Sequence, residues 1–253
     1  IAKNAKDKSN FLASGDGGDE LFGGYTFRYS KFLSLIKPNS SPLHKIQSYL
    51  SCHERDWVPD QERIFNSKTN FSWNSINSIF EPFFDNSLSP LDQVFLADYN
   101  GKLLYNFSII GNKINHFFNL KPVTPILDPK LITYSTQLSS GSKYDSSKNI
   151  GKLPLRKLLT KYNCDSLVSK KKLGFSVNTI NLWNSVGKNL CINYLENARI
   201  VEDGWINKEW ISSHIDNPNL NVRYVNKFLG LLALEIWYRL FVTKELNSTT
   251  KLS

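Results

Sequence analysis

Three carboxylates stand among glycines in the segment SGDGGDELFGGY, residues 14–25. Glycine lets the backbone adopt positive φ and approach a ligand closely, and successive N–H groups in such a turn can form an anion-binding concavity. Asp16 and Asp19 lie three residues apart, and magnesium is usually held by one or two carboxylates together with substrate phosphates. The segment therefore predicts a site for phosphate groups and a bridging Mg²⁺.

The same segment could also be a glycine-rich turn that caps a helix. Asp19 and Glu20 would then lie in the first helical turn, where the helix dipole favours negative charge. This explanation gives no role to Asp16 or to the two glycines after it. Two common nucleotide-binding motifs are absent and so do not support the phosphate site. No GxxxxGKS/T occurs, and the start of a GxGxxG pattern at Gly15 has Glu20 in place of its last glycine.

Basic residues are concentrated in one part of the chain. The 253 residues include 31 Lys and Arg against 22 Asp and Glu, and residues 140–172 hold nine basic residues but two acids. Such a segment attracts the phosphates of a nucleotide or a nucleic acid, or it is a solvated lysine-rich face. Only Tyr144 and Tyr162 could stack on bases there, so nucleic acid is not expected as a partner.

Helical periodicity dominates the sequence. Residues 10–13 form the one expected strand, a short apolar run between Ser9 and the glycines. Apolar residues recur at helical steps over 43–50, 91–107, 155–162, 180–195 and 222–246, and Asp128-Pro129 is a helix start signal. The sequence predicts a predominantly α fragment with one short strand near its N-terminus, whose sheet partners would precede residue 1.

Other features narrow the class of protein. The longest apolar stretch, residues 228–241, is interrupted by Glu235 and Arg239, whereas a membrane helix needs about 20 predominantly apolar residues. We therefore expect a buried helix of a soluble protein and no membrane partner. The three cysteines are odd in number and form no CxxC pair, which is typical of a reducing cytoplasm. Because the chain has no Met, we expect it to be the C-terminal part of a longer protein.

Five motifs in order resemble the synthetase domain of glutamine-dependent asparagine synthetases. SGDGGDELFGGY resembles the hallmark of that family. NKINHFFNLKPVTPILD (112–128) is similar to the family's segment ending in Pro-Phe-Leu-Asp, and KLPLRKLL (152–159) is similar to its Lys-x-x-x-Arg helix. KKKLGF (170–175) resembles its Arg-x-Lys-x-Gly-Phe loop, and FLGLLALEIWYRLF (228–241) resembles its closing tryptophan helix. The resemblance implies that residues 1–253 are the C-terminal portion of one Rossmann-like, adenine-nucleotide alpha-hydrolase-like synthetase domain.

The resemblance implies an asparagine synthase (glutamine-hydrolysing) type ligase. In that family ATP adenylates the side chain of aspartate, and ammonia then displaces AMP to give asparagine. The implied cofactors are ATP and Mg²⁺. The implied partners are aspartate or a related carboxylate, and ammonia from glutamine supplied by a glutaminase domain outside this chain. The family's Ser-Gly-Gly-x-Asp-Ser pyrophosphate loop is absent from these residues, so we expect the chain alone to be inactive.

Matching the motifs residue by residue gives an expected site. Ser14 and Gly15 would contact ATP, and Asp19 would bind magnesium. Asp16 would be catalytic, by orienting the acyl adenylate or by accepting a proton from ammonia. Lys172 would also be catalytic, by stabilising charge on the transferring phosphoryl group and on pyrophosphate.

One departure from the family leaves the substrate open. Lys121-Pro122-Val123 stands where the family has Glu-x-Arg, so another carboxylate could replace aspartate. A second interpretation is a related adenylating amide synthetase of the β-lactam synthetase kind, although that family typically has tyrosine at the position of Asp16. A third is a basic RNA-binding or tRNA-modifying ATPase module, and a fourth is a non-catalytic relative.

Overall fold

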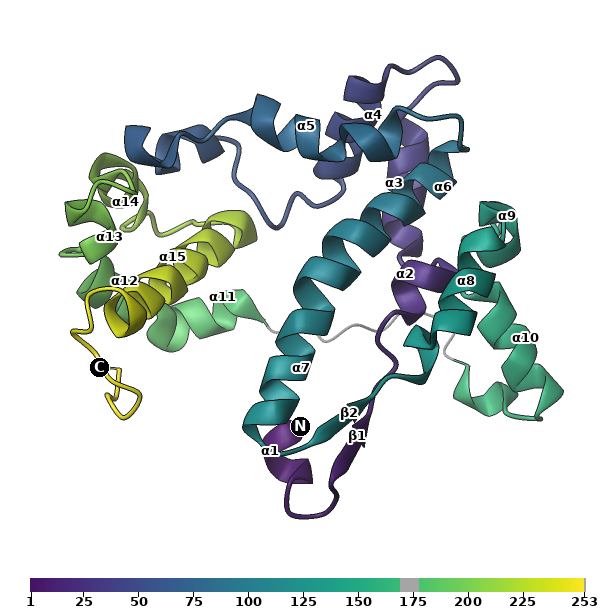
Figure 1. Ribbon diagram of the computed structural model, residues 1–253. Coiled ribbons are helices and arrows are strands. Elements are labelled where there is room, and N and C mark those ends of the chain that lie inside the picture. The colour runs from purple at the N-terminus through teal and green to yellow at the C-terminus, as the bar shows by residue number, and fades with distance from the viewer. Residues whose placement is uncertain (169–177, 253) are drawn as a thin grey trace. The chain divides into compact units, whose positions relative to one another are not determined.

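The computed structural model describes residues 1–168 and 178–252, and these divide into two compact units (Figure 1). Unit 1 contains the described parts of residues 1–52 and 78–174, and unit 2 those of residues 53–77 and 175–253. Helices make up 62% of the structure. The prediction of a predominantly helical chain is therefore confirmed.

Unit 1 holds both strands of the described chain. Its elements are α1 (Ala2–Ala5), β1 (Phe11–Ala13), α2 (Gly18–Phe22), α3 (Thr26–Leu35), α4 (Pro42–Ser51), α6 (Pro90–Ala97), η3 (Asp98–Phe107), α7 (Ser108–Phe117), β2 (Lys121–Val123), η4 (Pro125–Leu127), α8 (Pro129–Gln137), α9 (Ser140–Lys143), α10 (Leu153–Lys161) and η5 (Asp165–Leu167). Helix α6, the π-helical η3 and α7 follow one another without a break (Figure 1).

The regular elements of unit 2 in its described residues are helices, and Phe65 and Ile206 form an isolated antiparallel bridge. Its elements are η1 (Gln61–Ile64), η2 (Ser67–Thr69), α11 (Thr179–Leu182), η6 (Trp183–Gly187), α12 (Lys188–Leu195), α13 (Arg199–Glu202), α14 (Lys208–His214) and α15 (Val222–Phe241). Helix α5 (Trp73–Phe84) contains the boundary between the two units.

The expected helices are present, with small shifts at their ends. Asp128 caps α8, since its carboxylate accepts a hydrogen bond from the N–H of Lys130 at 2.9 Å. Helix α15 ends at Phe241 instead of Leu246. The β-branched pair Val242 and Thr243 follows this end, and both N–H groups bond back to the Tyr238 carbonyl.

The sheet corrects the expectation of a single strand. Strand β1 pairs in parallel with β2, and Phe11, Leu12 and Ala13 lie opposite Lys121, Pro122 and Val123. The sequence signal for β2 is weak because the strand has three residues and a central proline, which lacks an N–H donor. The partner of β1 thus comes from later in this chain.

Each unit has its own apolar core. In unit 1, aromatic side chains of α3 and α4 dominate, with Tyr29, Phe32 and Tyr49 buried against Phe84 and Phe95. The Tyr29 ring meets the Phe95 ring edge-on at 5.0 Å between centroids. This core lies against α2 through Tyr29, whose hydroxyl donates to the Asp19 carbonyl at 3.5 Å.

The core of unit 2 is organised around α15. The buried stripe of this helix includes Val225, Phe228 and Leu232, as its periodicity predicts. Glu235 is also fully buried, and its carboxylate accepts the N–H groups of Arg199 and Ile200 at 2.8 and 3.0 Å. The acid thereby satisfies the first N–H groups of α13, which have no partner inside that helix.

No helix in the described parts of the chain has the length and apolar character that crossing a bilayer requires.

Candidate functional site

The acidic glycine turn joins the end of β1 to the start of α2. Gly17 is the N-cap residue of α2 and has φ +86°, a conformation that favours glycine. A Cβ at Gly17 would also lie 2.3 Å from the Leu127 side chain. The turn follows the carboxyl end of a parallel strand, the edge at which open α/β sheets bind their ligands.

Ser14 and Asp16 contact each other at the start of the turn. The Ser14 hydroxyl donates a hydrogen bond to Asp16 Oδ2 at 2.8 Å, and the Ser14 N–H donates to the Val123 carbonyl at 2.9 Å. Asp16 and Gly15 are exposed. The hydroxyl therefore orients the Asp16 carboxylate while solvent still reaches it.

Asp19 is paired with a lysine from the start of α10. Lys152 Nζ lies 3.0 Å from Asp19 Oδ1, and both side chains are partly buried, with exposed fractions of 34% and 20%. The Lys152 backbone has φ +59°, which is uncommon for a residue other than glycine, asparagine or aspartate. Its N–H donates to the Phe22 carbonyl at 2.9 Å, and this bond fixes the lysine against the end of α2.

Two glycines make this close approach possible. A Cβ at Gly24 would lie 1.8 Å from Asp19 Oδ1 and 2.5 Å from Lys152 Cε. A Cβ at Gly151 would lie 1.9 Å from the Gly23 carbonyl oxygen. The contact between Asp19 and Lys152 therefore requires glycine at positions 24 and 151.

A buried tyrosine supports the first turn of α2. The Tyr25 hydroxyl donates to the buried Glu20 carboxylate. Burial and this hydrogen bond raise the pKa of Tyr25 well above its ordinary value. Two cations face the Tyr25 ring, Arg28 at 4.1 Å and Lys102 Nζ at 4.3 Å from its centroid. These contacts fix α2 and the Asp19 that it carries.

Asp98 is a buried acid at the start of η3. Burial raises its pKa to about 6, although Arg28 and the hydrogen bond from Tyr49 act in the opposite direction. The Tyr49 hydroxyl donates to Asp98 Oδ1 at 2.7 Å, and Arg28 lies 3.8 Å from the same oxygen. A carboxyl in this setting changes its charge near the lower end of the physiological pH range.

The structure places four of the five expected site residues on one turn. Ser14, Gly15 and Asp16 lie between β1 and α2, and Asp19 lies in the first turn of α2. Lys172 is one of residues 169–177, which lie outside the described part of the chain. The contact of Asp19 with Lys152 was not anticipated, although residue 152 opens the Lys-x-x-x-Arg motif and stands after a glycine.

The basic segment has mixed roles. Lys143 is buried, its Nζ lies 5.1 Å from the centroid of the Phe95 ring, and burial lowers its pKa. Lys148 is exposed and lies 3.8 Å from Asp145. Lys152 alone of these three reaches the acidic turn. These three lysines therefore have three different roles: Lys143 packs in the core, Lys148 is solvated, and Lys152 contacts the candidate site.

The donor chemistry of the turn fits magnesium. Asp16 and Asp19 offer carboxylate oxygens, the hard ligands that Mg²⁺ takes in combination with phosphates. The described residues contain no group of three or more His, Cys, Asp or Glu that could hold a metal by themselves. Lys152 is at Asp19 Oδ1, so a cation at that oxygen would have to share it with the ammonium group.

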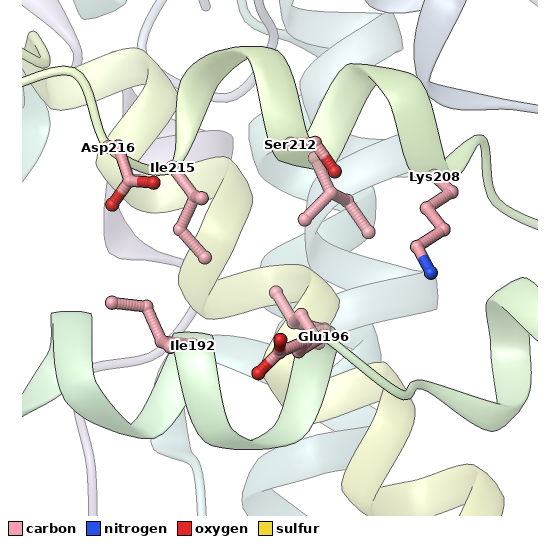
Figure 2. Close-up of a pocket in the computed structure, with 8 residues that line it drawn as sticks. Ile192, Glu196, Lys208, Ser212, Ile215 and Asp216 are labelled. Carbon is pink, nitrogen blue, oxygen red and sulfur yellow. The ribbon is translucent and has the colours of Figure 1, made fainter.

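Unit 2 has a surface pocket whose lining residues are distant in the sequence from the acidic glycine turn. It has a volume of about 220 Å³ and lies between α12 and α14 (Figure 2). Ile192, Ile211 and Ile215 form its apolar part, and Glu196, Lys208 and Asp216 carry its charges. Acids and lysines are mixed there, and Lys188 pairs with Asp216 at 3.7 Å. None of the expected site residues lines this pocket.

Comparison with known proteins gives a consistent result. The profile of the family described as asparagine synthase matches residues 1–239. Proteins described as putative glutamine-hydrolyzing asparagine synthetases, from Mycobacterium bovis and Mycobacterium tuberculosis, are 25% identical to this chain over 216 aligned residues. The match covers 74% of this chain and 32% of each relative, so the chain spans about a third of their length. No solved structure matches it.

Proposed function

Because this chain belongs to the asparagine synthase family, we propose that it forms part of the ATP site of a ligase that amidates a side-chain carboxylate. The substrate is aspartate, which ATP activates as β-aspartyl-AMP with release of pyrophosphate, and ammonia then displaces AMP. The ammonia comes from glutamine through a glutaminase domain that these residues do not include. Residues 1–253 are the C-terminal portion of the synthetase domain, and a cytoplasmic location is part of the same proposal.

The pairing of Asp19 with Lys152 is the observation that carries this proposal. A simple helix cap would explain an acid in the first turn of α2. It would not explain a lysine held at 3.0 Å by strained backbone and by two glycines without side chains. Strained residues of this kind concentrate at functional sites. The arrangement places one positive and one negative group together beside exposed backbone at the end of β1.

Each residue of the turn has a proposed task. Ser14 and Gly15 bind the nucleotide, and Ser14 also orients Asp16 through its 2.8 Å hydrogen bond. Asp16 orients the acyl adenylate or accepts a proton from ammonia. Lys152, with Lys172, neutralises charge that develops on the phosphates. Asp19 would hold Mg²⁺, which supplies further positive charge to the phosphates when it is bound.

A lysine substitution in the complete enzyme tests this proposal. Lys152→Met keeps the aliphatic stem and removes the charge, so carboxylate-dependent ATP–pyrophosphate exchange should slow by about 10²-fold. Lys148→Met is the matched control, because that lysine is exposed and its ion pair is with Asp145. An unchanged exchange rate in Lys152→Met would contradict the assignment.

The substrate needs its own test. Lys121 stands where the family has an acid, and it is exposed with its Nζ 5.8 Å from the Phe11 ring. Exchange should be measured with aspartate, glutamate and N-substituted β-amino acids in parallel. Stimulation by aspartate supports the proposal, whereas stimulation by a β-amino acid alone would support the β-lactam synthetase alternative.

A further inference from the structure

Gly111 of α7 leaves an open space on the side of the helix that faces the acidic glycine turn. A Cβ at this glycine would lie 3.9 Å from Asp16 Oδ2. Apart from the backbone of α7 and the two chain neighbours of Gly111, no other described atom lies within 4 Å of that point. The Asp16 carboxylate and the α7 backbone therefore enclose a small space between them.

Polar side chains flank this space. Ser108 precedes Gly111 by three positions and Asn115 follows it by four, so both lie on the same face of α7. Both residues are half-buried, and neither the Ser108 hydroxyl nor the Asn115 amide has a side-chain hydrogen bond to another described residue. The inward face of a surface helix normally carries apolar side chains, so a polar inward face indicates a polar ligand.

The oxygen of Asp16 that faces Gly111 has a fixed orientation. The Ser14 hydroxyl donates to this Oδ2 at 2.8 Å, and the Ser14 N–H is held by the Val123 carbonyl at 2.9 Å. A carboxylate oxygen can accept more than one hydrogen bond. Oδ2 can therefore accept a second donor from the side of α7, at about 2.7–3.2 Å.

We propose that this space, the Gly111 niche, holds the ammonia that attacks the acyl adenylate. This role rests on the proposed function and assigns new positioning residues to its second step. Asp16, Ser108 and Asn115 each offer an oxygen that accepts a hydrogen bond, and these three acceptors match the three N–H groups of ammonia. The nitrogen lone pair then remains free to attack. Position 111 carries no side chain because a methyl group there would take the place of the nitrogen.

The chemistry of the niche accounts for every atom and charge. The lone pair of ammonia forms the new C–N bond at the acyl carbon, and the C–O bond to AMP breaks as AMP leaves with the bonding electrons. The nitrogen then carries one proton more than an amide does. The Asp16 carboxylate accepts this proton, whereas the hydroxyl of Ser108 and the amide of Asn115 only orient the nitrogen.

Separate measurement of the two steps in the complete enzyme tests the niche. Carboxylate-dependent ATP–pyrophosphate exchange needs no ammonia, whereas amide formation with ammonium chloride does. Gly111→Ala should raise the KM for ammonia about tenfold or more, because the added methyl group excludes the nitrogen. It should leave the exchange rate unchanged.

A second glycine of the same unbroken helical segment provides the control. Gly101 lies on η3, and nothing lies within 4 Å of a Cβ added there. Gly101→Ala should therefore change neither exchange nor the KM for ammonia. Alanine is the better helix former, so neither glycine substitution should lower the midpoint of thermal unfolding, which separates the niche from a defect in folding.

The flanking polar residues give an independent measurement. Ser108→Ala and Asn115→Ala each remove one hydrogen-bond acceptor without filling the niche. The KM for ammonia should rise about three- to tenfold in each variant, the size of one lost hydrogen bond, again with unchanged exchange.

Three other outcomes would overturn the niche. Exchange that Gly111→Ala slows as much as amide formation would assign the space to the carboxylate substrate instead. An equal KM for ammonia in Gly111→Ala and Gly101→Ala would show that the space is only solvent. If no carboxylate stimulates exchange in the unchanged enzyme, the proposed function itself fails and the niche fails with it.

Discussion

Asp16 and Asp19 lie three residues apart, but their surroundings differ. Asp16 is exposed and accepts a hydrogen bond from Ser14, whereas Asp19 is partly buried against the Lys152 ammonium group. The Ser14 hydroxyl carries no charge and leaves the Asp16 carboxylate available to a substrate. The Lys152 ammonium group holds the Asp19 carboxylate in one orientation. The proposed roles of the two acids can therefore be separated by experiment.

The two acids should respond differently to magnesium. In the complete enzyme, Asp19→Asn should slow ATP–pyrophosphate exchange by about 10²–10³-fold, and added Mg²⁺ should restore part of the loss because the defect is in binding the ion. Asp16→Asn should lower amide formation without rescue by the metal. The measurement is exchange and amide formation across a Mg²⁺ titration. Equal rescue of both variants would show that both acids are metal ligands, and full activity of both would leave only a helix cap.

Gly24 offers a way to disturb the pair without removing either charge. Gly24→Ala places a methyl group 1.8 Å from Asp19 Oδ1, so Asp19 and Lys152 must separate. Displacements of about 1 Å in such a site can cost about 10²-fold in rate. Gly141→Ala is the control, because nothing lies within 4 Å of its added methyl group. Activity that is the same in both variants would show that the spacing of the pair is unimportant.

At the scale of elements, η3 and α3 meet at a buried charge. Asp98 on η3 is fully buried and lies beside Arg28 of α3 and Tyr49 of α4. The structure holds these elements together with a hydrogen bond and an ion pair inside an otherwise apolar, aromatic-rich core. The protonation of one carboxyl therefore affects how tightly three helices pack.

Stability of unit 1 should fall as the pH rises from 4 to 6. The pKa of Asp98 is raised from 3.8 to about 6 in the folded chain, so the folded state binds more protons than the unfolded state in this window. The stabilisation of the folded state by the protonated Asp98 carboxyl is fully present below about pH 4 and is lost above about pH 6. The free energy of unfolding changes by at most about 3 kcal/mol over this range. Hydrogen exchange of residues 26–35 by mass spectrometry should show this loss. Asp98→Asn, which keeps an acceptor for Tyr49, should flatten the profile, and a profile as steep as that of the unchanged chain would contradict the assignment to Asp98.

At the scale of the whole molecule, the tryptophans report on one unit. All six, at positions 57, 73, 183, 205, 210 and 237, belong to unit 2. Trp183 and Trp210 are buried against Phe228 of α15. Tryptophan fluorescence therefore follows unfolding of this unit separately from hydrogen exchange in unit 1.

Removing the buried Glu235 should destabilise unit 2 selectively. Glu235→Ala leaves the N–H groups of Arg199 and Ile200 without their acceptor and leaves Arg239 without its carboxylate. Breaking a buried pair of this kind costs about 3–5 kcal/mol. The midpoint of denaturant unfolding, followed by tryptophan fluorescence, should fall accordingly. Glu196→Ala, at an exposed acid of the same unit, should change it little, and a loss as large as that of Glu235→Ala would contradict this explanation.

The sequence by itself determined the local structure and the family. Period and capping signals predicted α4, α8, α10 and α15, because a helix is fixed by contacts three and four residues apart. The strand at residues 11–13 and the turn after it were also predicted, since the apolar run and the glycines are adjacent. The order of the motifs indicated the asparagine synthase family, which the profile match confirms. The roles of Ser14, Gly15, Asp16, Asp19 and Lys172 remain predictions.

Only the tertiary structure decided which distant residues meet. Strand β2 pairs with β1 although its three residues carry almost no strand signal. Lys152 reaches Asp19 because its N–H is held by the Phe22 carbonyl and because Gly24 has no side chain. Such contacts depend on the path of the backbone between distant elements, which local periodicity does not specify. The sequence marked an acidic turn, and the fold supplied the lysine that distinguishes it from a helix cap.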